Sequence, residues 1–419
     1  MASLDRPLLR PLSGRRLDRE GRPFVALSDS LGLIQGQVLI PLDAFQQVIR
    51  RFDGRTTLEE IRASIANAEP GLTPSLVELE SLVDRLDREM VLDGPTFAAF
   101  ATRYAAETVR PPSHAGRSYP ADPSALRARL DEFFDDPRGS GRPLFEVAPA
   151  GGRLRGVLSP HIDFGRGGPT YTHAYRALAE RSDADVFVIL GVAHQSCKHR
   201  FALTRKDFRT PLGTASTDRA FVDHLAETAG SHLFEDELAH RTEHSIEFQV
   251  VFLQHVLGGR RNFTIVPILV GSFHDLMRQP GGPRADPEVS SMVRALRSAE
   301  AASGRKVAYI GGIDLCHVGP EFGDPSPVDD TTLATVQNFD EAMLGRAEAG
   351  DALGWFATAA GVDDRWRVCG LSATYTMLQA IGPARGRVLR YDQAVDPLRT
   401  CCVTFASVAF DADPAAEHD

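Results

Sequence analysis

The feature that most constrains the fold is a series of near-continuous apolar runs from residue 154 onward. Strands covered on both faces are apolar throughout, whereas half-exposed strands alternate apolar and polar residues. The runs that we predict as strands are LRGVLSP (154–160), DVFVILG (185–191), FTIVPILVG (263–271), KVAYIGG (306–312), RVLRYD (387–392) and CVTFASVAF (402–410). Helical segments are expected between most of them, over 170–181, 218–229, 243–256, 286–302, 331–347 and 370–381. This alternation predicts an α/β fold, a three-layer arrangement with helices on both faces of one sheet.

Residues 1–106 predict a small, mainly helical module that closes on a short strand. In RTTLEEIRASI, Thr57 and Glu60 stand at the spacing of a capping box, so a helix should begin there. A second helix is expected with Thr73 as its N-cap and Pro74 at its first position. The apolar stripe of this second helix comprises Leu76, Leu79, Val83, Leu86 and Met90.

The boundary between this module and the α/β domain is expected in the segment 107–123. Its sequence, ETVRPPSHAGRSYPADP, is rich in proline and small residues. At the other end of the chain, residues 412–419 predict a frayed acidic tail.

Composition and charge restrict the partners and the environment that we expect. The formal net charge is -10, so broad electrostatic attraction to nucleic acid or to an anionic membrane is not expected. No run approaches the ~20 apolar residues of a membrane span, and the charged N-terminal stretch does not resemble a signal peptide. The five cysteines are odd in number and irregularly spaced, which favours reduced thiols in the cytoplasm over a disulfide framework.

Side chains that can bind a metal follow three predicted strands at the point where each strand ends. They are His161 and Asp163 after 154–160, His194 after 185–191, and Asp314, Cys316 and His317 after 306–312. A single histidine in such a loop is more often a cap or a surface residue, so the prediction depends on their coincidence at one edge of the sheet. Imidazoles together with a carboxylate or thiolate suit non-haem iron, copper or zinc.

One predicted helix carries a second group of acidic and imidazole side chains. In HRTEHSIEFQ, Glu243 and Glu247 lie four residues apart on one helix face, with His244 beside them and His240 four residues before it. Pairs of metal ligands occur at that spacing, and a solvated helix face with ion pairs is an equally good interpretation. The sequence leaves both alternatives open.

Two more stretches carry reactive or charged groups next to predicted helices. Cys369 precedes a helix whose positive end favours a thiolate, although a small buried cysteine is the commoner arrangement. In HIDFGRGGPTY, glycine amides and Arg166 lead into a helix start that can hold a carboxylate or phosphate. A plain tight turn is the alternative for this glycine-rich stretch.

Seven motifs occur in a fixed order along the chain, and together they resemble one family. They are SPHIDF, ILGVAHQS, FRTPLGT, TEHSIEFQVVFLQ, FTIVPILVG, GGIDLCHVG and VCGLSATY, preceded by HAGRSYPADPSALRARLDEFF. Residues 112–411 resemble the Memo family, whose microbial members are called AmmeMemoRadiSam system protein B. The family is similar in fold to class III extradiol dioxygenases, which use non-haem ferrous iron. Within the N-terminal module, roughly residues 30–95 resemble the PqqD-like winged-helix domain, which recognises peptides, through the stretch FDGRTTLEEI (52–61). The alternative is a helical extension that packs on the main domain or on a dimer partner.

The resemblance implies a set of functional residues. Metal ligands fall on His161, His194 and Cys369, with Asp314 and His317 close by. The EHSIE stretch, which contains Glu243, His244 and Glu247, corresponds to a helix lining the same cleft.

This chain departs from the pattern of the eukaryotic members at three places. Ile162, Asp163 and Phe164 stand where those proteins have Ala-Gly-Tyr, and Gln195 stands in place of a second histidine. CGLS replaces Cys-Gly-Arg-His. The extra carboxylate of Asp163 near the metal means that the ligand set, the metal and the substrate can differ from those relatives.

We therefore expect a cytoplasmic, metal-dependent oxidoreductase that uses iron or copper. His317 or His244 would move protons, Asp314 would orient an imidazole or a water, and Arg166 would anchor an anionic group. Asp163, Glu243, Glu247 and Cys316 would contact substrate or support the ligands. One alternative is a non-catalytic module that binds a peptide, an AMMECR-type protein or a radical SAM enzyme. Another is a zinc-dependent hydrolase, because the same ligands bind zinc.

Overall fold

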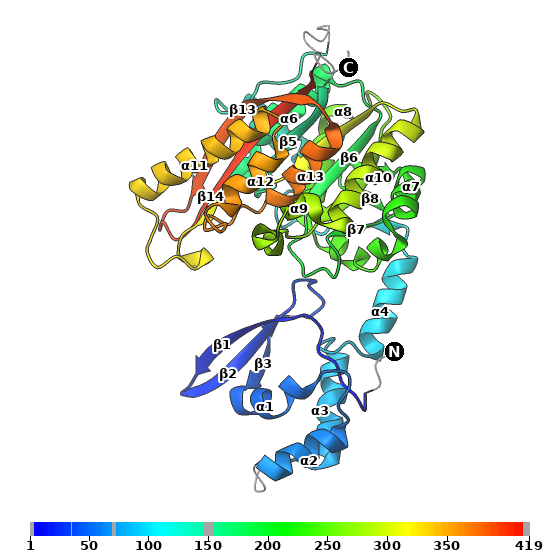
Figure 1. The fold of residues 1–419 in the computed structure, drawn as a ribbon, viewed down its shortest axis with the longest axis vertical. Coiled ribbons are helices and arrows are strands. Elements are labelled where there is room, and N and C mark those ends of the chain that lie inside the picture. The colour runs from blue at the N-terminus through cyan, green and yellow to red at the C-terminus, as the bar shows by residue number, and fades with distance from the viewer. Residues whose placement is uncertain (1–3, 35, 69–72, 146–153, 414–419) are drawn as a thin grey trace. The chain divides into compact units, whose positions relative to one another are not determined.

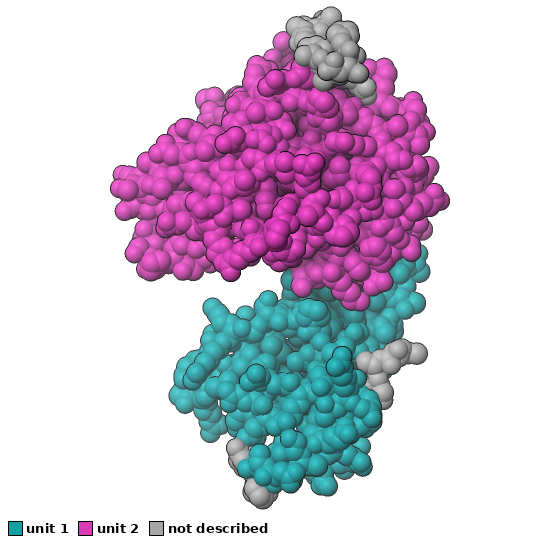
Figure 2. All heavy atoms as spheres, viewed as in Figure 1, with its two compact units in different colours: residues 1–107 teal, residues 108–419 magenta. Residues whose placement is uncertain are grey.

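The computed structural model describes all residues except 1–3, 35, 69–72, 146–153 and 414–419. The chain divides into two compact units, residues 1–107 and residues 108–419 (Figure 2). From Thr108 onward, the segment that we expected as a boundary belongs to the second unit. Most of the predicted acidic tail lies outside the described residues, and Ala412 is the last residue of a strand.

The first unit combines a small antiparallel sheet with helices that cover it (Figure 1). Its elements are β1 (Ser13–Arg19), β2 (Arg22–Ser28), β3 (Val38–Pro41), α1 (Leu42–Gln47), α2 (Leu58–Ala68), α3 (Leu76–Arg88) and α4 (Pro95–Ala106). The predicted capping box is confirmed, because the backbone N–H of Thr57 donates to the carboxylate of Glu60 and the N–H of Glu60 donates to the Thr57 hydroxyl.

Two expectations for this unit need correction. The module is mainly helical as expected, but it contains a sheet of three strands, β1, β2 and β3, in place of one short closing strand. Strand β1 is exposed on both faces and carries the polar sequence SGRRLDR, so it lacks the apolar alternation that predicts a strand. The N-cap of α3 is Ser75 and not Thr73, because Glu78 stands three residues after Ser75 and completes a reciprocal capping box.

A large mixed sheet forms the centre of the second unit and confirms the predicted α/β class. Its strands are β4 (Val109–Arg110), β5 (Leu154–Ser159), β6 (Val186–Val192), β7 (Phe201–Leu203), β8 (Asp207–Thr210), β9 (Gly213–Thr217), β10 (Thr264–Val270), β11 (Val307–Gly312), β12 (His317–Val318), β13 (Ala384–Val395) and β14 (Cys402–Ala412). The order is β12-β14-β5-β11-β6-β10-β9-β8-β4, with β13 beside β14 and β7 beside β10. Strands β5, β11, β6 and β10 are parallel to one another, so their carboxyl ends lie at one edge.

Helices cover both faces of this sheet (Figure 1). They are α5 (Pro123–Asp135), α6 (Phe164–Arg181), α7 (Arg219–Ala229), α8 (His244–Leu257), α9 (Gly282–Ala285), α10 (Pro287–Ser303), α11 (Asp330–Glu348), α12 (Ala352–Ala360) and α13 (Leu371–Ile381). Along β6, Val186 and Val188 pack with α7, α10 and α13, whereas Phe187 and Ile189 pack with α5, α6 and α8. Within the described residues, no helix combines the length and the apolar character needed to cross a membrane.

A buried ion pair attaches the start of the second unit to α8. The guanidinium of Arg110 donates to Glu247, and both side chains are fully buried. Glu247 also accepts hydrogen bonds from the backbone N–H groups of Ser113 and His114, each at 3.0 Å, and from the Tyr119 hydroxyl. Because this one carboxylate holds the segment from Arg110 to Tyr119, we expect the segment to depend on it.

Replacing Arg110 with alanine should lower the free energy of unfolding by about 3–5 kcal/mol, because the Glu247 carboxylate would stay buried without its cation. Denaturant unfolding of the two proteins measures this difference. The matched control is Arg129→Ala, which removes the exposed Arg129–Glu132 pair and should cost less than about 1 kcal/mol. Equal losses in the two variants would contradict the prediction.

Candidate metal centre

A cleft of about 370 Å³ opens at the carboxyl ends of the parallel strands. Its polar lining includes His114, His161, His194, His244, Asp314 and His317. Ligands in open α/β sheets bind at this edge. The cleft therefore brings together most of the side chains that the sequence singled out.

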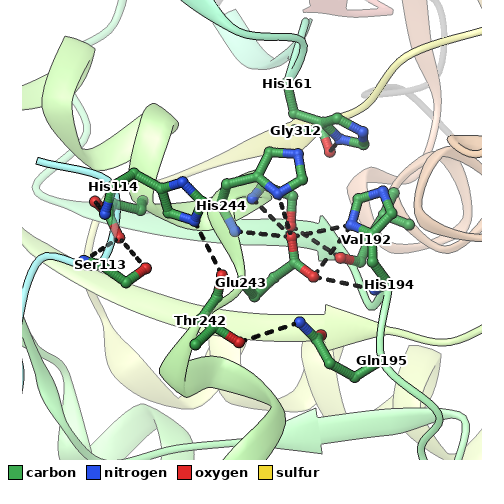
Figure 3. Close-up of polar contacts among 12 residues, drawn as sticks. Ser113, His114, His161, Val192, His194, Gln195, Thr242, Glu243, His244 and Gly312 are labelled. Atoms are coloured by element: carbon green, nitrogen blue, oxygen red, sulfur yellow. Dashed lines mark hydrogen bonds and ion pairs between the residues drawn. The ribbon is translucent and has the colours of Figure 1, made fainter. Parts of the chain in front are cut away.

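Three of these imidazoles form a compact group (Figure 3). His161 follows β5, His194 follows β6, and His244 is the first residue of α8. One ring nitrogen from each lies within 4.8 Å of those of the other two. The ring centroids are 5.0 Å apart for His161 and His194, 5.3 Å for His161 and His244, and 4.8 Å for His194 and His244.

Each of the three rings has its Nδ1 atom close to a fixed oxygen. Nδ1 of His161 lies 2.8 Å from the carbonyl oxygen of Gly312, which can only accept, so this nitrogen carries the hydrogen. Nδ1 of His194 lies 3.0 Å from Oε1 of Glu243, and Nδ1 of His244 lies 3.2 Å from the same atom. This arrangement leaves a lone pair on Nε2 of His161, and on Nε2 of His194 when that ring is neutral, as in histidines that bind metals.

Glu243 orients two of the imidazoles and also caps α8. Its carboxylate accepts hydrogen bonds from the backbone N–H groups of His244 at 2.8 Å, Ser245 at 3.0 Å and His194 at 3.0 Å (Figure 3). Burial alone would raise the pKa of Glu243. Attraction to His194 together with these hydrogen bonds outweighs burial, so the pKa of Glu243 is lowered and the group is ionised.

The same environment shifts the pKa values of the three imidazoles in different directions. Burial lowers the pKa of His161 to about 3, with repulsion from His194 as the next cause. Burial also lowers the pKa of His244 to about 3, against the attraction of Glu243. For His194 burial is outweighed by that attraction, and its pKa is raised. At neutral pH, His161 and His244 are neutral and can donate a lone pair.

Three further groups stand around His161. Oδ2 of Asp314 lies 3.6 Å from its Nε2, and Oδ1 accepts the backbone N–H of His161 at 3.0 Å. Burial raises the pKa of Asp314. Sγ of Cys369 lies 3.4 Å from the same Nε2 but is not part of the three-imidazole group. Nδ1 of His317 faces the carbonyl oxygens of Leu315 and Arg367, and its ring lines the cleft.

Burial raises the pKa of the Cys369 thiol well above its ordinary value, so without a bound cation it is a thiol. We expected the positive end of the helix after Cys369 to favour a thiolate. That helix is α13, and its N-cap is the next residue, Gly370. The pKa is raised all the same, so burial of the sulfur outweighs the effect of the helix end.

Three residues singled out from the sequence do not line the cleft. Cys316 is buried, and its thiol donates to Oδ1 of Asp340 at 3.0 Å, away from the cleft lining. Glu247 binds Arg110 and does not itself line the cleft, but it accepts the backbone N–H of His114, which does. His240 is buried as well, and its ring contacts the carbonyl oxygen of Ala202.

The glycine-rich stretch after His161 does not form the tight turn that we considered, because it lies inside the first turns of α6. A Cβ on Gly168 would lie 2.6 Å from the Phe133 ring, so the glycine is needed for close helix packing. Asp163 is the N-cap of α6 and pairs with Arg166, and both side chains line the cleft.

His114 also lines the cleft, and it lies in the segment that we expected as a boundary and not among the predicted site residues. Its Nε2 is 3.0 Å from the carbonyl oxygen of Thr242, and its ring centroid is 5.6 Å from that of His244 (Figure 3). A histidine among small residues in SHAGRSYP was the signal available. The amide nitrogen of Gln195 points at the Thr242 hydroxyl 3.5 Å away.

In protein freed of metal with a chelator, lowering the pH from 7 to 5 should reduce the free energy of unfolding. Unfolded histidines have a pKa of about 6.5 and bind protons over this range, whereas folded His161 and His244 stay neutral until about pH 3. Each of these histidines makes a contribution to the free energy of unfolding that is fully present above pH 6.5. By pH 5 this contribution has fallen by about 2 kcal/mol per histidine. Urea unfolding at both pH values measures the loss, and the same loss in His161→Gln would contradict the assignment.

The cleft lies in a part of the chain that is similar to known proteins. The family model described as Memo-like protein matches residues 110–409. A MEMO1 family protein of Methanopyrus kandleri is 31% identical over 294 residues, which cover 68% of this chain and 93% of that protein. Another from Aquifex aeolicus is 25% identical over 397 residues, or 93% of this chain and 96% of the relative. A third, from Thermus thermophilus, is 27% identical over 81% of this chain and 94% of its own length.

The matched span contains the parallel strands and every residue of the three-imidazole group. The order of motifs in the sequence already resembled this family. The chain belongs to the Memo-like protein family.

Proposed function

We propose that this protein binds a first-row transition metal through His161, His194 and His244. The observation that carries the proposal is the convergence of three imidazoles whose Nδ1 atoms each face a fixed oxygen. Glu243 supplies the negative charge that offsets a cation, and its buried carboxylate holds two of the ligands. Cys369, a ligand that the family resemblance implies, is within reach of His161 as a soft fourth donor.

The chemistry that best fits the donor set is oxidation and reduction by iron or copper, similar to that of class III extradiol dioxygenases. When bound, either metal would supply one-electron chemistry and an open coordination position for dioxygen or substrate. His317, with its Nδ1 held by two carbonyl oxygens, would present its other nitrogen to move a proton. Arg166, paired with Asp163 at the rim, would hold an anionic substrate group.

Protein purified without oxygen should contain close to one equivalent of iron or copper in this site, measured by mass spectrometry of the metals. His161→Ala, His194→Ala and His244→Ala should each lose that equivalent, because two imidazoles are left to hold the ion. His274→Ala is the matched control, since His274 is 58% exposed and lies outside the group. Parent levels of iron or copper in His161→Ala would contradict the proposal, and zinc as the single metal would favour hydrolysis over redox chemistry.

Cys369→Ser tests the fourth donor separately. If the sulfur binds the ion, this variant should lose the sulfur-to-metal charge-transfer band of the copper-loaded or iron-loaded protein. An unchanged spectrum would limit the ligands to the imidazoles.

A second candidate function concerns the first unit, for which we propose peptide binding by strand addition, as in PqqD-like domains. Within the described residues, β3 pairs with β2 alone, so its other edge is open. A hollow of about 710 Å³ lies between β3 and α3, and Val38, Leu39, Ile40 and Leu82 line it. Backbone groups on an open strand edge bind extended chains, and adjoining apolar hollows select side chains. The partners would be an AMMECR-type protein or a radical SAM enzyme of the same system.

Leu39→Asp should weaken binding of a purified radical SAM partner at least tenfold, because a charge would enter the hollow beside β3. Titration of the labelled partner measures this change. Val77→Asp on α3 is the control, since Val77 is 69% exposed and does not line the hollow. His161→Ala should bind the partner like the parent, and equal affinity for all variants would contradict the assignment.

A further inference from the structure

A second group of metal-ligating side chains lies in the second unit, separate from the three-imidazole group. It comprises His199, His232 and Glu288, and one ligand atom from each lies within 4.8 Å of the other two. His199 stands in the loop after β6, His232 in the 3-10 helix Ser231–Phe234, and Glu288 in the first turn of α10. Residues this far apart in sequence meet only because the tertiary fold brings three separate elements together.

The two imidazoles are held in position by their surroundings. The backbone N–H of His199 donates to Oδ2 of Asp236 at 2.9 Å, and the rings of His199 and His232 are 4.5 Å apart. A Cβ on Gly230 would lie 2.4 Å from Nδ1 of His232, so this glycine makes room for the ring. Among the described residues, the buried Nε2 of His199 has no hydrogen-bond partner. A buried ring nitrogen in that state suits a ligand.

One carboxylate oxygen of Glu288 accepts a backbone hydrogen bond, and the other oxygen is available to bind an ion. Its Oε1 accepts the backbone N–H of Arg200 at 2.7 Å, which fixes the carboxylate at the start of α10. Oε2 of Glu235 lies 3.6 Å from Nε2 of His199 and offers a further oxygen. The donors are thus two imidazoles and one carboxylate, with a second carboxylate at the edge.

The charges around the group favour a cation. The acidic side chains are Glu235, Asp236, Asp275, Asp286 and Glu288, and the basic ones are Lys198 and Arg200. Arg200 is already bound by Asp275 and Asp286, and Lys198 lies 3.6 Å from Glu235. Negative charge is in excess, and a divalent ion would offset it.

We propose that His199, His232 and Glu288 form a binding site for a divalent ion of the zinc class. Two imidazoles and one carboxylate with an open fourth position are a ligand set that zinc accepts. Ligand atoms around zinc lie about 3.4 Å apart, since each bond is about 2.0–2.1 Å, so small side-chain rotations close the group. A hollow of about 650 Å³, lined by His199, Glu288 and Cys197, gives the ion access.

The site would act on the three-imidazole group through one short loop. His194 begins the segment that ends at His199, five residues later, and both follow β6. An ion that joins His199 to His232 and Glu288 therefore fixes the far end of the loop that positions His194. This second site does not depend on the first one holding a metal.

The test uses the full chain with His161→Ala and His244→Ala together, which removes two imidazoles of the first group. Titration of this protein with zinc, against a chromophoric chelator of known affinity, should show one bound equivalent. Adding His232→Ala should abolish binding, whereas adding His274→Ala should leave it unchanged. No zinc bound by the double variant would overturn the inference, while the metal content of the parent still decides the proposed function separately.

Glu288→Gln keeps the test decisive if a histidine variant fails to fold. Glutamine can still accept the Arg200 N–H through its side-chain carbonyl but lacks the negative oxygen, so zinc affinity should fall at least tenfold. Cobalt substitution gives an independent readout, because tetrahedral cobalt absorbs strongly in the visible range. Unchanged zinc affinity and an unchanged cobalt spectrum in Glu288→Gln would remove Glu288 from the site.

Discussion

The parallel hydrogen-bond ladder through β5, β11 and β6 is the constraint on which the candidate metal centre depends. Ser159 pairs with Gly312, and Gly312 pairs with Gly191, so the three strands end at one level. His161, Asp314 and His194 each follow these positions by two or three residues and therefore arrive at the same edge. The backbone N–H of His161 binds Asp314, which adds a direct link between two of the strand ends.

The second determinant of the centre is a buried carboxylate that serves a helix and a pair of imidazoles together. Glu243 ends the loop before α8 with an extended backbone, φ -72° and ψ 131°, so its side chain turns back over the first amides of the helix. In that position it also faces His194 and His244. Taking a carboxylate out of water is costly, and here backbone N–H groups and imidazoles offset the cost. The group that caps the helix thus also orients two of the imidazoles that line the cleft.

How far the sequence predicts the structure depends on how much of each element is buried. All six apolar runs are strands, and five of them are continuously apolar because both of their faces are buried. The sixth, RVLRYD, lies in β13, which is only half-buried. Strand β1 was missed because neither of its faces is buried, and nothing in SGRRLDR differs from a loop. In α3, Thr73 and Ser75 are both good caps, and the reach of Glu78 back to Ser75 decides between them. Local patterns therefore predict elements whose energetics are local or dominated by burial.

The sequence by itself determined the α/β class, the family and the strand ends that carry His161, His194 and Asp314. Only the tertiary structure shows that Glu243 and Glu247 have different partners, because the sequence places them four residues apart on one helix face. Glu243 precedes the helix and binds His194, whereas Glu247 lies one turn inside α8 and binds Arg110, 137 residues away. The same holds for His199, His232 and Glu288, whose approach no local pattern encodes. Contacts between distant segments depend on how helices and loops pack on the sheet, and that packing is a property of the whole chain.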